Sequence, residues 1–295
     1  MNFAAPDRAT VMVIVSIIAI VIFFGISVFI YKQFQCRFNS NDYAMCSDED
    51  FDQVHLEPNY LIKLHYLLHI SDKILKMAKV EYVAISGTLL SMFRTEFLTP
   101  WDDDGDLNVN KADFEQSKSK IDQLLQHFGL YLNDPFWFAK LEIFQLKMVD
   151  GHPLQAKYPS AREPFVDWVL YEKMTTEDAH GYENSNGRDV YHFSSPRERE
   201  LFPREFLFSD ELYPIRQKSL AVFSAAAAKR LGVENPTLSL DVPNNAISFL
   251  NRAYGAKNDK SMWRDCYLAS SHQSMTLFVK PCKLTENQVQ RLLND

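Results

Sequence analysis

The longest mainly apolar stretch runs from Val11 to Tyr31 and is interrupted only by Ser16, Gly25 and Ser27. It contains 21 residues and no charge. At about 1.5 Å per residue, this length just crosses the roughly 30 Å hydrocarbon core of a bilayer. The stretch does not end in the small residues of a cleavage site, which argues against a signal peptide. The pattern predicts a transmembrane anchor at 11–31 that follows a short tail at 1–10.

Polar and acidic residues then dominate at 32–55, which predicts a stem between the membrane and a folded domain. The remaining residues, 56–295, are numerous enough to bury a sizeable core. Lysine and arginine counts on the two sides of the apolar stretch do not decide its orientation, and they lean slightly against a lumenal C-terminus. The chain has four cysteines, which allow three pairings.

Within 56–295 the apolar positions recur alternately at helical and strand periods. Helical spacing predicts helices at 59–79, 88–93, 114–128 and 244–254. Alternation or short apolar runs predict strands at 82–85, 104–110, 141–148 and 165–170. Residues 172–200 are polar and contain two glycines, which predicts a long surface loop. Helices that alternate with strands predict an α+β domain with a mixed β-sheet flanked by helices.

The net charge of −7 argues against a nucleic-acid partner, because proteins that neutralise a phosphate backbone usually carry a basic stripe. A small phosphorylated donor is compatible with an acidic chain if a metal ion supplies the positive charge.

Four carboxylates crowd into Asp102-Asp103-Asp104-Gly105-Asp106, directly after Pro100-Trp101. Asp104 and Asp106 alternate along a predicted strand, so both side chains leave the same face about 6–7 Å apart. Two carboxylates at this spacing can share Mg²⁺ or Mn²⁺, which prefer oxygen ligands and keep positions for substrate phosphates. The alternative interpretation is an acidic turn screened by water.

A second element precedes the acidic run. Ser86-Gly87-Thr88 lies where a strand passes into a helix, and backbone amides at a helix start can bind phosphate. Arg94 follows about two turns later and can reach a phosphate. Taken alone, these residues are equally compatible with a tight turn and a surface arginine.

Together, the two elements resemble the LicD and fukutin-related family of nucleotidyltransferase-fold enzymes. The resemblance lies in Ser86-Gly87-Thr88-Leu89-Leu90, Arg94 and the run from Pro100 to Leu107, and it extends over roughly 56–265. Phe165-Val166-Asp167 and Val242-Pro243-Asn244-Asn245 also agree with the order of motifs in the family. The chain departs from the family pattern at Ser86, at Gly105 and in a stretch at 216–241 that does not align.

The resemblance implies a transferase that moves a phospho-alcohol from a CDP-linked donor to a hydroxyl of a glycan or glycoprotein, with release of CMP. The alcohol would be ribitol phosphate, glycerol phosphate or phosphocholine. The ligands of Mg²⁺ or Mn²⁺ would be Asp104, Asp106 and Asp167. Asp167 could instead accept the proton of the acceptor hydroxyl. Ser86, Gly87, Thr88 and Arg94 would bind donor phosphate. The resemblance also implies a type II, single-pass membrane protein of the Golgi or endoplasmic reticulum with a lumenal domain.

Two other functions stay open from the sequence. The first is nucleotidyl transfer from a nucleoside triphosphate, which the fold allows and which would release pyrophosphate instead of CMP. The second is a catalytically silent protein that binds a glycan or a partner enzyme, because Gly105 could loosen the strand that carries the metal ligands.

Overall fold

The structure is a computed structural model that describes most of the chain between residues 56 and 254. The described ranges are 56–94, 102–134, 142–175, 187–221 and 237–254, with short pieces at 96, 98–99, 182, 229, 256–257, 260–261, 268–269, 282–283 and 287–288. The predicted tail, membrane anchor and stem, 1–55, lie outside these residues. Within the described part, no helix is long and apolar enough to cross a membrane.

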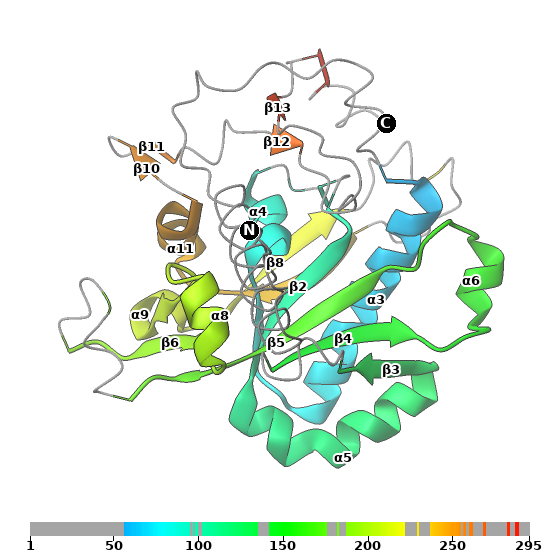
Figure 1. Ribbon diagram of the computed structural model, residues 1–295, viewed down its shortest axis with the longest axis horizontal. Helices are drawn as coiled ribbons and strands as arrows, with labels where there is room; N and C mark the ends of the chain where they lie inside the picture. The colour runs from blue at the N-terminus through cyan, green and yellow to red at the C-terminus, as the bar shows by residue number, and fades with distance from the viewer. Residues whose placement is uncertain are drawn as a thin grey trace, which may run out of the picture.

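Helices and strands alternate along the described chain, as predicted (Figure 1). The helices are α3 (Pro58–Ala78), α4 (Ser86–Arg94), α5 (Lys111–Phe128), α6 (Pro153–Lys157), α8 (Pro196–Leu201), α9 (Ser209–Leu212) and α11 (Ala246–Tyr254). The strands of the main sheet are β1 (Tyr82–Ala84), β2 (Asp104–Asn110), β3 (Leu130–Asn133), β4 (Ile143–Met148), β5 (Phe165–Lys173), β6 (Val190–Phe193) and β7 (Leu207–Phe208). Separate strand pairs are β8 (Arg216–Ala221) with β9 (Thr237–Val242), β10 (Ala256–Lys257) with β11 (Lys260–Ser261), and β12 (Leu268–Ala269) with β13 (Cys282–Lys283).

The main sheet is mixed and has the strand order β1-β2-β5-β4-β3, with β6 and β7 continuing from the far end of β5. Strands β2 and β5 are parallel, whereas the other neighbours in the sheet are antiparallel. In Figure 1, α8, α9 and α11 gather near β6, on the side opposite α3. This arrangement confirms the predicted α+β class with a mixed sheet flanked by helices.

One face of the sheet packs against α3. Leu107 and Trp168 are register partners on β2 and β5, and both are fully buried. The indole Nε1 of Trp168 donates a hydrogen bond of 3.2 Å to Ser71 Oγ on α3. Because side chains alternate between faces of a strand, Asp104, Asp106 and Asp167 leave the opposite face.

The boundaries of the long helices follow local signals. Pro58 is tolerated in the first turn of α3, where its missing N–H would have no helical partner. The side chain of Asn110 caps α5 by accepting a hydrogen bond of 3.2 Å from the amide of Asp113. Gly129 ends α5 with φ 65°, in the left-handed region that glycine adopts freely. These ends fix where β2 passes into α5 and α5 into β3.

Gly105 has a packing role on β2. A Cβ at this position would lie 2.6 Å from Leu68 Cδ2 of α3 and 3.3 Å from Val166 Cγ2. Leu68 therefore fills the space that a side chain at 105 would occupy. This contact explains why glycine, rather than an apolar residue, stands between the two aspartates.

Gly105→Ala is expected to destabilise the protein by about 2 kcal/mol, because an added methyl group in a packed core forces neighbours to move. The measurement is urea unfolding of the full-length protein. Gly187→Ala is a contrasting variant: a Cβ there would have no neighbour within 4 Å, and its cost would arise from a φ of 79°, a left-handed conformation that Gly105 does not adopt. A change of less than about 0.5 kcal/mol for Gly105→Ala would contradict the packing role.

The predicted surface loop at 172–200 is wrong at its first two residues and over much of its second half, whereas 176–181 and 183–186 lie outside the described residues. Strand β5 continues to Lys173, and β6 returns antiparallel to it with Tyr171 opposite Phe193. Helix α8 follows at 196–201. The polar sequence concealed these elements because β6 and α8 are short and acquire most of their burial from contacts outside the segment.

His192 on β6 is buried in its neutral form, at 1 % exposure. Its Nε2 lies 3.1 Å from the carbonyl oxygen of Phe202, and its Nδ1 is buried with no hydrogen-bond partner among the described residues. Burial lowers the pKa of His192 to about 3; the charges of Arg199 and Arg252 act in the same direction, and the contact with Phe202 opposes them. Protonation would therefore place an uncompensated charge beneath α8.

Acid is expected to destabilise the fold through His192. The unfolded histidine takes up a proton near pH 6.5, whereas the folded one resists protonation until about pH 3. The stabilising contribution is therefore complete above pH 6.5 and declines as the pH falls, by about 2 kcal/mol between pH 7 and pH 5. Urea unfolding at both pH values should show a smaller loss for His192→Gln than for the unchanged protein. The exposed His69→Gln serves as the control, and equal pH dependence in both variants would refute the assignment.

Candidate active site

Three aspartates converge on the open face of the sheet, where β2 and β5 run parallel. Asp106 lies directly opposite Asp167 in the register, and Asp104 lies opposite Phe165. Each of the three half-buried carboxylates offers an oxygen atom, and these atoms all lie within 4.8 Å of one another. The structure thus brings together the three residues that the sequence analysis proposed as metal ligands, across 61 positions of sequence between Asp106 and Asp167.

The crowding of these carboxylates is unfavourable without a counter-ion. Burial, reinforced by the charges of Asp106 and Asp167, raises the pKa of Asp104 well above its usual range. Burial and the charges of Asp102, Asp167 and Glu205 do the same to the pKa of Asp106. Burial raises the pKa of Asp167 to about 7, although a hydrogen bond from Gln145 and the charge of Lys147 oppose the rise. A bound cation would relieve this repulsion.

Asp167 contributes a second observation on this donor set. Its Oδ1 atom is buried and has no hydrogen-bond partner among the described residues. Buried polar atoms in folded proteins are normally satisfied by protein, water or an ion. Three convergent carboxylates with one unsatisfied oxygen form the hard, all-oxygen donor set that suits Mg²⁺ or Mn²⁺. The residues present therefore fit a divalent cation.

The Ser86–Thr88 turn is bonded to the acidic strand. The amide of Gly87 donates a hydrogen bond of 3.2 Å to Asp106 Oδ2, and the amide of Asp106 donates one of 2.8 Å to Thr88 Oγ1. A Cβ on residue 87 would lie only 2.2 Å from Asp102 Oδ2, so the close approach requires glycine. The two predicted motifs form one unit, and these residues orient the aspartates.

Arg94 lies at the end of α4, beside the acidic run. Its Nη2 donates a hydrogen bond of 3.1 Å to Thr99 Oγ1. Burial and the charges of Asp104 and Asp103 raise the pKa of Asp102 well above its usual range, and the Arg94 charge opposes this effect. Arg94 thus balances part of the negative charge of the site. Pro100 and Trp101 lie outside the described residues.

Two glutamates from the α8–β7 segment also face the site, and the sequence analysis missed both. Glu198 is 4 % exposed, and burial raises its pKa to about 7 with further contributions from the charges of Glu205 and Asp167. Burial raises the pKa of Glu205 to about 7, opposed by its hydrogen bond from Ser86. The sequence did contain a signal for α8. Ser195-Pro196 is a typical helix start, and Glu198 is an acidic residue in the first turn.

Strand β4 adds two polar residues on the same face. Gln145 lies opposite Asp167 in the register of β4 and β5. Lys147 follows two residues later on β4, so its side chain leaves the same face of the sheet. The Lys147 Nζ atom is 5.3 Å from the centre of the Phe165 ring. Among the described residues, Lys147 makes no ion pair with a carboxylate. Its ammonium group therefore lies near Asp167, where it can contact an anionic ligand.

Residues 79–222 match the family model described as LicD/FKTN/FKRP, nucleotidyltransferase domain. This range runs from just before β1 to just after β8 and includes every site residue named above. No curated protein matches the chain. The match supports the resemblance of this domain to the LicD and fukutin-related family.

Proposed function

We propose that the protein is a membrane-anchored, metal-dependent transferase that moves a phospho-alcohol from a CDP-linked donor to a glycan hydroxyl and releases CMP. A LicD domain indicates a transferase of phosphorus-containing groups. The observation that carries the finer proposal is the convergence of Asp104, Asp106 and Asp167, within 4.8 Å of one another inside that domain. Diphosphate donors need a compensating positive charge, and the three convergent carboxylates support a bound cation as its source.

A divalent ion held by the three aspartates would supply positive charge to the diphosphate oxygens. The chain's own residues set the geometry around it. The amide of Gly87 orients Asp106, and Gln145 orients Asp167. Lys147 on the same face offers its cation to a donor phosphate, which adds electrostatic complementarity to a diphosphate. Phosphoryl transfer depends mainly on such positioning and charge compensation.

The proposal includes the placement of the protein. The apolar stretch at 11–31 would anchor it in a Golgi or endoplasmic reticulum membrane as a type II protein, and the stem at 32–55 would hold the domain in the lumen. This arrangement is supported by the uncharged length of the stretch and by the family assignment. The acceptor would be a glycan or glycoprotein of the lumen.

The test is CMP release by the full-length protein in detergent with Mn²⁺ or Mg²⁺. CDP-ribitol, CDP-glycerol and CDP-choline are offered in turn with a mixture of glycan acceptors. We expect metal-dependent CMP release from one donor, and its loss on chelation. Pyrophosphate release from a nucleoside triphosphate would replace the proposal with nucleotidyl transfer. A folded protein that binds donor without any turnover would indicate the silent alternative.

A further inference from the structure

Ser86 meets Glu205 across 119 residues of sequence. The Ser86 hydroxyl donates a hydrogen bond of 2.7 Å to Glu205 Oε2. Ser86 has φ 45°, in the left-handed region that residues other than glycine rarely adopt. Glycine would adopt this conformation freely, so the serine brings strain together with one added polar group. Its hydroxyl contact with Glu205 is the evident compensation.

The conformation of Ser86 directs the next peptide group toward the metal site. The peptide plane between Ser86 and Gly87 carries the N–H that donates to Asp106 Oδ2 at 3.2 Å. A rotation at Ser86 would turn this N–H away from the carboxylate, since the peptide unit is rigid. A ligand carboxylate that loses its orienting hydrogen bond binds its ion less well.

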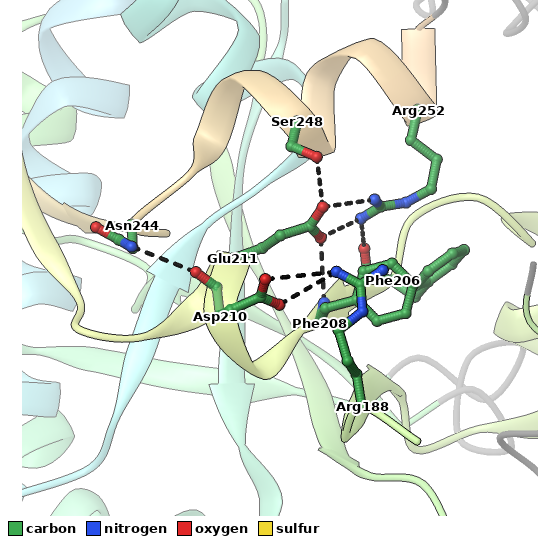
Figure 2. Close-up of polar contacts among 8 residues, drawn as sticks. All are labelled: Arg188, Phe206, Phe208, Asp210, Glu211, Asn244, Ser248 and Arg252. Atoms are coloured by element: carbon green, nitrogen blue, oxygen red, sulfur yellow. Dashed lines mark hydrogen bonds and ion pairs between the residues drawn. The ribbon is translucent and has the colours of Figure 1, made fainter. Parts of the chain in front are cut away.

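The backbone next to Glu205 is held by contacts with α11. The carbonyl of the adjacent Phe206 accepts a hydrogen bond from Arg252 on α11 (Figure 2). Arg252 also makes two hydrogen bonds, of 2.9 and 2.8 Å, to the buried carboxylate of Glu211. Its guanidinium lies 4.1 Å from the centre of the Phe206 ring. A bidentate, stacked arginine is a rigid anchor for the backbone that carries Glu205.

From these contacts we infer that Glu205 is a positioning residue of the metal site: it fixes Ser86, and through the Ser86–Gly87 peptide it orients Asp106 toward a divalent cation. The inference rests on the proposed function, in which that cation is bound. It assigns to the α8–β7 segment a role in metal affinity, although it supplies none of the three ligands.

Charge offers a competing explanation, because a glutamate near Asp106 also attracts a cation directly. The variants separate the two effects. Glu205→Gln removes the charge but keeps an oxygen that accepts the Ser86 hydrogen bond. Glu205→Ala removes both. Ser86→Gly keeps the charge of Glu205, removes the hydroxyl and relieves the left-handed strain.

The measurement is the Kd of Mn²⁺ for the full-length protein by isothermal titration calorimetry. We expect about tenfold weaker binding for Glu205→Ala and for Ser86→Gly, and the double variant should be little worse than either single one. Glu205→Gln should stay within about threefold of the unchanged protein. Equal weakening by Gln and Ala, with Ser86→Gly unaffected, would replace positioning with a simple charge effect.

Two controls keep the outcomes distinct. Glu200→Ala alters an exposed glutamate of the same segment and should leave the Mn²⁺ affinity unchanged. Thermal unfolding separates structure from positioning, because Ser86→Gly should weaken Mn²⁺ binding without lowering Tm. If the unchanged protein binds Mn²⁺ no better than Asp106→Asn, the proposed function fails. If it binds Mn²⁺ and Glu205→Ala binds equally well, only the positioning role fails.

Discussion

Asp106→Asn is expected to lower metal-dependent transfer by at least about 1,000-fold, which corresponds to roughly 4 kcal/mol of lost transition-state stabilisation. Asp106 lies at the centre of the site: it faces Asp167 across the parallel strands and accepts the amide of Gly87. Asparagine keeps the volume and an accepting oxygen, so the turn should remain bonded. The lost quantity is the charge that attracts the cation. Asp104→Ala should show a loss of similar size.

The measurement is CMP release at saturating donor, accompanied by Mn²⁺ titration calorimetry. Asp122→Asn, an exposed aspartate on α5, is the matched control and should retain full activity. Thermal unfolding must show that Asp106→Asn is folded. Retention of more than a tenth of the activity in both Asp106→Asn and Asp104→Ala would remove the metal site from the mechanism.

Lys147→Gln is expected to lower kcat/KM for the CDP-linked donor by about 100-fold, mainly through KM. A charge-assisted hydrogen bond contributes about 1.5–3 kcal/mol, and this range sets the size of the effect. Lys147 is suited to the role because its ammonium lies over Phe165 on the face that carries the aspartates. Lys147→Arg should recover part of the affinity, since the positive charge is kept.

Donor binding separates this role from a general change in the site. Calorimetry with CDP and Mn²⁺ should show weaker nucleotide binding for Lys147→Gln, whereas Mn²⁺ binding alone should not weaken. Lys120→Gln, which alters an exposed lysine of α5, is the control. Unchanged donor affinity in Lys147→Gln would exclude a phosphate contact.

Local signals predicted much of the scaffold. Helical spacing located α3 and α5, and alternation located β2 with Asp104 and Asp106 on one face. These elements are long or strongly patterned, so their local preferences agree with the tertiary structure. The Ser86–Thr88 turn was also located from sequence, but its bonding to Asp106 was not, because that contact depends on how β1 and β2 pair.

The rest of the site depends on long-range contacts that no local pattern encodes. The parallel register that sets Asp106 against Asp167 arises only after α5, β3 and β4 have intervened. Glu198 lies in the stretch that was predicted as a surface loop, and Glu205 follows in a part of the chain for which no element was predicted. In the sequence, Lys147 is an ordinary polar position of an alternating strand. Only the order of strands in the sheet places it beside the aspartates.

The acidic cluster also bears on how this chain has been shaped by selection. Half-buried carboxylates that repel one another lower the stability of the protein when no cation is present, and a single neutral substitution would relieve that burden. Most proteins stand only slightly above the stability that they need, so an unused liability of this kind is readily removed by mutation. The presence of Asp102, Asp104, Asp106 and Asp167 together, with the buried Glu198 beside them, therefore favours the proposed transferase over the catalytically silent alternative.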